Sequence, residues 1–277
     1  MGVYTLFISG FITLFLLMVK NKGKGDLFFY YGLLSFLIFI SLLLYNLIQY
    51  KEEIGMLGQS EEKGNIRAGN ISKMVNVLTE RKLDVPLLSQ LPELPRGCEV
   101  TSLAMLLQYD GVNVGKMELA ENVKKDSTPM TVQNGLIHFG NPHNGFVGDM
   151  YSYKNPGYGV YHQPIEELAE SYIPNEIINL TGNDFGEVIN SINNEQPVWI
   201  ITNTTFKKLP DTQFDTWDTE QGQIKITYRE HSVVVTGYNE NYIYFNDPLT
   251  YQKDRKIQKE NFIAAWEQMG KQAIAVK

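Results

Sequence analysis

The sequence predicts an α+β protein in which helices pack on an antiparallel sheet, preceded by two transmembrane helices. Three observations support this prediction. Two long apolar segments open the chain, amphipathic helical patterns lie between about residues 97 and 195, and separate β-branched and aromatic runs occur between residues 197 and 248. Helices followed by strands in this way are typical of α+β domains rather than of alternating α/β folds.

The two apolar segments are residues 2–19 and 27–48, and neither contains a charged residue. Each is about as long as a helix that crosses a bilayer. The short loop between them carries three lysines, whereas the residues after the second segment are not net basic. By the positive-inside rule the loop is cytoplasmic and both termini lie outside. We therefore expect a multi-pass cell-membrane protein whose remaining domain is extracytoplasmic.

The rest of the chain divides by composition. Residues 1–50 form the predicted transmembrane hairpin, residues 51–82 are a polar, glycine-containing linker, and residues 83–277 form the folded domain. The net charge of -7 argues against a nucleic-acid partner, since such a partner needs a basic surface. The single cysteine excludes an internal disulfide and a cysteine-based zinc cluster.

Apolar periodicity and turn residues place the elements of the folded domain. Helices are predicted over residues 97–109, 115–126, 164–173, 184–195 and 260–270. Strands are predicted over residues 197–204, 223–229, 231–238 and 242–248. Residues 129–164 are rich in Gly, Pro, Asn and aromatic residues, which predicts a long loop of ordered turns.

Cys98 directly follows Gly97 at the start of the first predicted helix. The first turn of a helix lowers the pKa of a thiol through its free N–H groups and the positive end of its dipole. Gly97 allows a close backbone approach, so the Cys98 N–H can serve in an oxyanion hole, with the Gln90 amide as a second donor. The alternative is an inert buried thiol, which is the common fate of a lone cysteine.

A candidate base lies far downstream. His231 begins the strand 231–238, and a turn joins this strand to residues 242–248. In a hairpin with a loop of three or five residues, His231 and Asp247 share a face, while a loop of two or four residues presents Asn246 instead. Either side chain can orient an imidazole and fix its tautomer.

Taken together, these segments resemble the papain-fold cysteine peptidases of family thirty-nine, the bacteriocin-processing, double-glycine leader peptidases and their free-standing relatives. The matching segments are Gln90, "GCE" at 97–99, "SLAM" at 102–105, "EHSVVVTGY" at 230–238 and "NDP" at 246–248. "NPHNGFVG", "GYGVY" and "MGKQAIAV" are similar to segments of the relatives that are not fused to a transporter. The resemblance covers about residues 83–277.

The resemblance implies a papain-like fold and four site residues. Cys98 is the nucleophile, His231 the general base and acid, Asp247 the orienting third member, and Gln90 the oxyanion donor. The chain has no Walker motif and no ATPase domain, so a role in bacteriocin export is not inferred. We expect no cofactor, and no metal site because the remaining histidines and nearby acids match no zinc spacing; these are His138, His143, Asp149 and His162.

The sequence therefore predicts a membrane-anchored, papain-like cysteine peptidase that hydrolyses a bond in a peptide or protein substrate on the extracytoplasmic side. Two alternatives stay open. The same groups can transfer an acyl group to an amine or cleave cell-wall peptides as an amidase. A non-catalytic peptide-binding or immunity module can also retain the same cleft without turnover.

Overall fold

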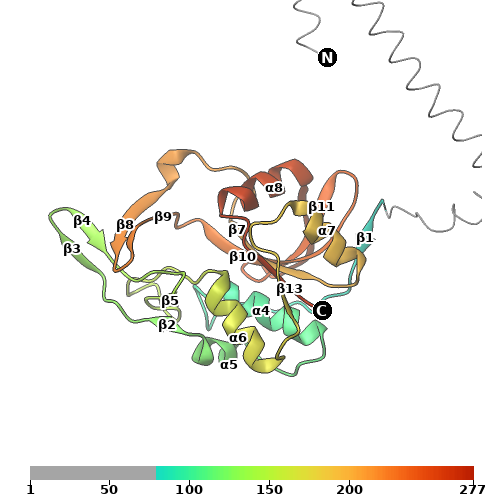
Figure 1. Cartoon of the computed structure of the whole chain (residues 1–277), viewed down its shortest axis with the longest axis horizontal. Helices are drawn as coiled ribbons and strands as arrows, with labels where there is room; N and C mark the ends of the chain where they lie inside the picture. The colour runs from blue at the N-terminus through green and yellow to red at the C-terminus, as the bar shows by residue number, and fades with distance from the viewer. Residues whose placement is uncertain (1–78) are drawn as a thin grey trace, which may run out of the picture. The chain divides into compact units, whose positions relative to one another are not determined.

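Residues 79–277 are described by the computed structural model, and a seven-stranded antiparallel sheet runs through them (Figure 1). The strand order is β12-β11-β10-β7-β13-β6, and β1 also pairs with β10. The bounds are β1 (Arg81–Lys82), β6 (Ile177–Asn179), β7 (Val198–Asn203), β10 (Glu230–Tyr238), β11 (Tyr242–Asp247), β12 (Gln252–Gln258) and β13 (Ala273–Val276). The predicted antiparallel sheet of an α+β fold is confirmed.

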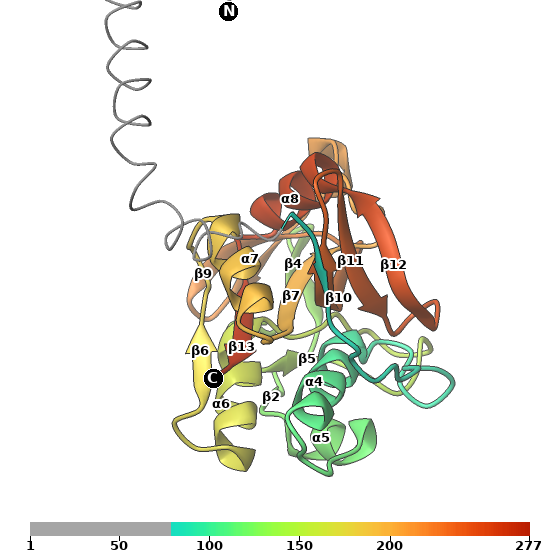
Figure 2. The ribbon, with the colours of Figure 1, turned by 90° about the vertical axis from the view of Figure 1, so that its right-hand side faces the viewer.

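Helices cover both faces of this sheet (Figure 2). They are α4 (Cys98–Tyr109), α5 (Lys116–Asn122), α6 (His162–Tyr172), α7 (Phe185–Asn193) and α8 (Lys259–Gln268). Each lies within a few residues of a helix predicted from the apolar periodicity. The amphipathic pattern was therefore sufficient to locate the helices of the described domain.

The central strand β7 divides the core into two apolar clusters. All six residues of β7 are buried, and successive side chains point to opposite faces of the sheet. Trp199 and Ile201 pack in a cluster with α4, α5 and α6. Val198 and Ile200 pack in a second cluster with α7 and α8. The strand reads as a continuous hydrophobic run because both of its faces are covered.

Two smaller sheets occupy the region around the predicted long loop. A four-stranded sheet joins β3 (Thr131–Gln133), β4 (Leu136–His138), β8 (Asp215–Thr219) and β9 (Gly222–Ile226), and a two-stranded sheet joins β2 (Lys125–Asp126) and β5 (Phe146–Val147). A short 3-10 helix, η1 (Asp211–Gln213), precedes β8. A third apolar cluster around Trp217 and Tyr158 joins these sheets to the segment before α6.

Several strands were not predicted from the sequence, and each omission has a physical reason. β12 reads QKDRKIQ and lies at the edge of the main sheet, where its side chains are mostly exposed or half-buried, so it carries no apolar alternation. β6 and β13 are too short to show a period. β1 falls within the last two residues of the predicted linker and pairs with Tyr238 and Gly237.

Within residues 79–277, none of the helices has the length and apolar character needed to cross a bilayer. The predicted transmembrane segments, residues 2–19 and 27–48, lie outside the described residues, as does most of the predicted linker.

Candidate active site

The nucleophile candidate lies at the first residue of α4, where the sequence predicted it. The turn before it requires glycine, since a Cβ on Gly97 would lie 2.6 Å from Leu94 Cβ. Trp199 Nε1 on β7 donates a 2.9 Å hydrogen bond to the Glu99 carbonyl oxygen, which ties the first turn of α4 to the sheet. The N–H groups of a first helical turn have no partner inside the helix, so the Cys98 N–H is available for an oxyanion.

His231 and Asp247 form a buried pair on neighbouring strands. His231 Nε2 lies 2.9 Å from Asp247 Oδ1, and the two side chains are only 2% and 1% exposed. Phe206 packs edge-on against the imidazole with 6.0 Å between ring centroids. Because Nε2 is held by the carboxylate, Nδ1 is the ring nitrogen left to accept a proton.

A β-bulge brings these two residues together. At the turn, Tyr238 pairs with Ile243, so residues 239–242 close the hairpin. A four-residue closure alone would turn Asn246 toward the face of His231. The register shifts by one at Thr236, however, so that Val234 pairs with Asn246 and Asp247 shares the face of His231. The bulge therefore places the Asp247 carboxylate, and not the Asn246 amide, on the face of His231.

The displaced Asn246 side chain has a structural role on the opposite face of the strand. Its Nδ2 donates to the carbonyl oxygens of Val85 and Pro86, at 3.0 and 3.1 Å, and its Oδ1 accepts from the backbone N–H of Asp254. The Asn246 side chain therefore connects the segment that contains Val85 and Pro86 to β11. Of the two orienting residues that the sequence left open, the structure places Asp247 against His231.

Asp247 is surrounded by hydrogen-bond donors. Its Oδ1 accepts from the backbone N–H of Leu249, and its Oδ2 accepts from Thr250 Oγ1 at 2.8 Å and from Arg255 Nη1 at 2.7 Å. Burial opposes the charge, but the bonds from His231, Thr250 and Arg255 outweigh it and lower the pKa of Asp247 well below its ordinary value. The carboxylate is therefore ionised at neutral pH.

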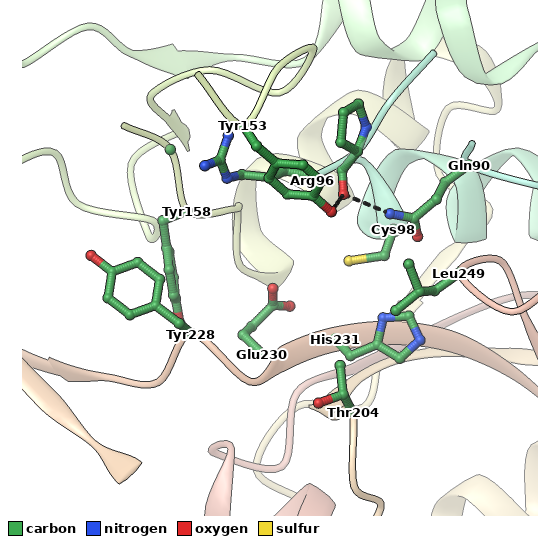
Figure 3. A pocket seen from close by; sticks show the side chains of 12 residues that line it. Gln90, Arg96, Cys98, Tyr153, Tyr158, Thr204, Tyr228, Glu230, His231 and Leu249 are labelled. Atoms are coloured by element: carbon green, nitrogen blue, oxygen red, sulfur yellow. Dashed lines mark hydrogen bonds between the residues drawn. The ribbon is translucent and has the colours of Figure 1, made fainter. Parts of the chain in front are cut away.

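Cys98, His231 and Gln90 line one pocket (Figure 3). They enter it from α4, from β10 and from the segment before α4. The Gln90 backbone N–H donates to the Pro248 carbonyl oxygen at 3.0 Å, which links this segment to the residue after Asp247. Gln90 Nε2 donates to the carbonyl oxygens of Leu94 and Pro95 at 3.3 and 3.0 Å. Before Gln90 Nε2 could donate to an oxyanion, one of these two hydrogen bonds would have to break.

The environment of the thiol differs from the expectation. Burial raises the pKa of Cys98 well above its ordinary value, and the nearby carboxyl groups of Glu99 and Glu230 raise it further. A backbone hydrogen bond with Ser232 offsets only part of this. The helix start was expected to lower this pKa, but desolvation and the two acidic neighbours dominate. Cys98 Sγ donates instead to Glu99 Oε2 at 3.3 Å, so the resting side chain is a neutral thiol.

The two glutamates face each other beside the sulfur. Glu99 Oε1 accepts the Val160 backbone N–H at 2.7 Å. A Cβ on Gly159 would lie 2.3 Å from Glu99 Oε1 and 3.0 Å from Glu230 Oε2, so only glycine leaves room for the pair. Burial raises the pKa of Glu99 to about 7, and burial together with Glu99 raises the pKa of Glu230 well above its ordinary value.

The folded domain is similar to a known protein family and to two known proteins. Residues 82–274 match the model of the Peptidase_C39 like family. The chain belongs to this family. It is 46% identical over 199 residues to the uncharacterized protein YvpB of Bacillus subtilis (strain 168), covering 71% of this chain and 76% of YvpB.

A solved structure from Bacillus anthracis, provisionally assigned as a C39-like peptidase, has 48% sequence identity and a TM-score of 0.67. The match covers 72% of this chain and 97% of that one. The resemblance to peptidase family thirty-nine that the sequence motifs indicated is thus confirmed, and the described domain has the α+β fold of C39-like peptidases.

The remaining histidines of this family member do not gather into a metal site. His138 Nε2 lies 3.7 Å from Asp218 Oδ2, and His162 Nδ1 lies 3.1 Å from Gln272 Oε1. Among residues 79–277, the one cluster of His, Cys, Asp and Glu ligand atoms is Cys98, Glu99 and Glu230, whose atoms lie within 4.8 Å of one another.

Glu99 and Glu230 stand inside the sequence motifs, but the motifs predicted no role for them. One signal was available. Glu99 is the only charged residue of α4, and Glu230 directly precedes the histidine on a buried strand. The sequence did not indicate that Glu99 and Glu230 lie close together, because 131 positions separate them. Arg255, which holds Asp247, was missed because β12 was not predicted, and Thr250, which also holds it, lies in the turn before that strand.

Proposed function

We propose that this chain is a cysteine peptidase that hydrolyses a peptide bond with Cys98, His231 and Asp247. The observation that carries the proposal is the buried His231–Asp247 pair in a pocket shared with Cys98. The carboxylate holds Nε2 and leaves Nδ1 as the base, which is the arrangement that an activated thiol requires. Membership of the Peptidase_C39 like family supports the same class of reaction.

The proposed reaction begins when a substrate turns the thiol away from Glu99. His231 Nδ1 takes the thiol proton, and the sulfur adds to the scissile carbonyl carbon. The oxyanion is held by the Cys98 N–H and by Gln90 Nε2. His231 then gives its proton to the leaving amine, and an acyl-enzyme forms. A water that His231 deprotonates hydrolyses the acyl-enzyme and restores the thiol.

The proposal extends to the N-terminal segments. Residues 2–19 and 27–48 would anchor the chain in the cell membrane, and the lysine-bearing loop between them would be cytoplasmic. The peptidase domain would then lie outside. Its substrate would be an extracytoplasmic peptide or protein, and no nucleic acid would be involved.

One experiment tests both activity and product type. Detergent-solubilised full-length protein is incubated with a defined peptide library, with and without an added primary amine, and the products are read by mass spectrometry. Cleavage that adds water and disappears in Cys98→Ala and His231→Ala supports the proposal. Peptides joined to the amine would assign an acyltransferase, cleavage limited to cell-wall peptides would assign an amidase, and cleavage retained in either variant would refute the mechanism.

Sidedness has its own measurement. A peptide-like electrophile that does not cross membranes is applied to intact cells, and labelled Cys98 is measured with and without external protease. Labelling that external protease removes supports the extracytoplasmic location. Labelling only after the cells are permeabilised would contradict it.

A second candidate is a peptide-binding module without turnover. It is favoured by the raised pKa of Cys98 and by its hydrogen bond to Glu99, which describe an unactivated thiol. A substrate-shaped electrophile separates the two candidates. A peptidase reacts with it far faster than with iodoacetamide because the bound peptide moves the thiol toward His231, whereas a binding module shows no such acceleration.

A further inference from the structure

The carboxyl groups of Glu99 and Glu230 have no part in the proposed chemistry, yet they lie beside the sulfur. The ligand atoms of Cys98, Glu99 and Glu230 are all within 4.8 Å of one another. Glu230 also lines the active-site pocket, and its carboxyl group points into it from β10 (Figure 3). This acidic pair therefore faces the region that a bound substrate would occupy.

The pocket also presents hydrogen-bond acceptors that lack donors. Among residues 79–277, neither Glu230 Oε1 nor Gln90 Oε1 has a hydrogen-bond partner, although both atoms are buried and Gln90 is only 2% exposed. Both residues line this pocket. A buried acceptor without a donor is costly and calls for an explanation. These two oxygens therefore favour a ligand that carries hydrogen-bond donors.

In the described domain, no lysine or arginine neutralises the pair. Within residues 79–277, neither Glu99 nor Glu230 forms an ion pair with a lysine or arginine. Arg96 is the cation in the pocket lining, and its guanidinium is committed elsewhere. It donates to the carbonyl oxygens of Asp149 and Ser152 and stacks on the Tyr153 ring, with 4.8 Å to the ring centroid.

We propose that Glu230, supported by Glu99, forms a subsite for a primary ammonium group of the substrate next to the scissile bond. An ammonium group hydrogen-bonded to Glu230 would lie within about 8 Å of Cys98 Sγ. The ammonium group would therefore lie close to the substrate residue whose carbonyl the sulfur attacks. Tyr158 and Tyr228 line the same pocket and offer aromatic faces to a cation. The proposal names the substrate class of the proposed peptidase site and rests on that function.

The subsite has a further consequence for the thiol. An ammonium group at Glu230 would supply positive charge beside both carboxylates and beside the sulfur. Burial would still raise the pKa of Cys98, but the ammonium group would offset the part of the rise that Glu99 and Glu230 cause. Substrate binding and thiol activation would then be linked, and peptides without the cation would meet an unactivated nucleophile.

The first test uses charged probes and needs no peptide substrate. Full-length protein contains one cysteine, so its reaction with 2-aminoethyl and 2-sulfonatoethyl methanethiosulfonate reports Cys98 alone. The ratio of the cationic to the anionic rate constant, divided by the same ratio for a free neutral thiol, measures the local charge. This ratio cancels any change in thiolate fraction, because both reagents attack the thiolate.

We expect the corrected ratio to exceed unity by about tenfold at pH 7.5, as a net negative charge within a few ångström predicts. Glu230→Gln should lower it severalfold, because an ammonium group that approaches Glu230 favours the ionised form of its carboxyl group. The double variant Glu99→Gln/Glu230→Gln should bring the ratio to unity or below, because Arg96 remains. Glu220→Gln, an exposed glutamate in the turn between β8 and β9, is the matched control and should leave it unchanged. A ratio that Glu230→Gln does not alter would overturn the subsite.

The second test identifies the source of the ammonium group. Matched peptides carry lysine or norleucine at the cleaved residue and its neighbours, each with a free or acetylated amino terminus. Preference for lysine whatever the terminus assigns a side-chain ammonium, and loss of cleavage on acetylation assigns a terminal one. In both cases Glu230→Gln should abolish the preference in kcat/KM.

The peptidase function and the ammonium subsite can be refuted independently of each other. A high thiosulfonate ratio without hydrolysis of any peptide would keep the cation subsite and reject the peptidase. Hydrolysis without preference for an ammonium group, in the wild type as in Glu230→Gln, would keep the peptidase and reject the subsite.

Discussion

His231 Nε2 lies 2.9 Å from Asp247 Oδ1, and the two residues face each other because the β10–β11 hairpin carries a bulge at Thr236. The bulge residue is itself fixed. Its carbonyl oxygen accepts the Leu83 backbone N–H, and its Oγ1 donates to Asp254 Oδ1. A contact in the candidate active site thus depends on pairing about five residues away along the strand.

Asp247→Asn tests the charge of this pair. The substitution keeps the shape but removes the carboxylate that binds His231 and Arg255, so we expect kcat/KM to fall by up to about 10⁴-fold. Kinetics on a cleaved peptide measure this change. Asp218→Asn is the matched control, because Asp218 is the partner of His138 outside the pocket. It should leave kcat/KM nearly unchanged.

The same variant should lose stability in a pH-dependent way. The folded-state pKa of Asp247 is lowered, so its stabilisation is complete above its ordinary pKa of 3.8 and is lost as the pH falls toward the folded value. We expect Asp247→Asn to be less stable than wild type by about 2 kcal/mol at pH 7, with a smaller difference at pH 3. Urea unfolding at both pH values measures it, and an equal difference at both would contradict the assignment.

Glu99→Gln should have the opposite effect on stability. Burial raises the folded-state pKa of Glu99 from 4.5 to about 7, so the wild type loses stability as the pH rises through this interval. The glutamine variant carries no such cost. We expect it to be more stable than wild type by about 2 kcal/mol at pH 8 and to lose this advantage near pH 5. Glu220→Gln, with an exposed side chain, should show no difference at either pH.

The same Glu99→Gln substitution should activate the resting thiol. The charge of Glu99 raises the pKa of Cys98, and the Glu99 carboxylate accepts the thiol hydrogen bond. Its removal should accelerate alkylation by iodoacetamide at pH 7.5 by about fivefold to tenfold. Since the chain has a single cysteine, total label incorporation gives the rate directly. An unchanged or slower rate would show that Glu99 does not restrain the thiol.

Gly159→Ala tests the space that the carboxyl pair needs. The new Cβ would lie 2.3 Å from Glu99 Oε1, so the pair must move, and we expect a loss of about 2 kcal/mol in stability together with an altered Cys98 alkylation rate. Gly186→Ala is the matched control, since Gly186 lies in α7 and a Cβ added there would meet no neighbouring atom within 4 Å. It should be neutral or stabilising by about 0.5–1 kcal/mol. Thermal unfolding compares the two variants.

The sequence by itself located the helices and the hairpin of β10 and β11, and its resemblance to peptidase family thirty-nine singled out Gln90, Cys98, His231 and Asp247 as site residues. Local signals were enough for the helices, the hairpin and the candidate nucleophile. Apolar periodicity marks α4 and α7 whatever their partners, and Cys98 stands after a glycine at a helix start. Strands such as β12 were missed because an edge strand with exposed side chains leaves no apolar pattern.

Tertiary structure decided what these residues meet. The choice of Asp247 over Asn246 depended on the bulge at Thr236, which no rule of loop length contains. The pKa of Cys98 was set by burial and by Glu99 and Glu230, which outweigh the helix start that the sequence displayed. Desolvation and charge act through space, and residues far apart in the chain supply both. The sequence therefore determined which groups could react, while the packing of α4 against β10 determined their ionisation and their neighbours.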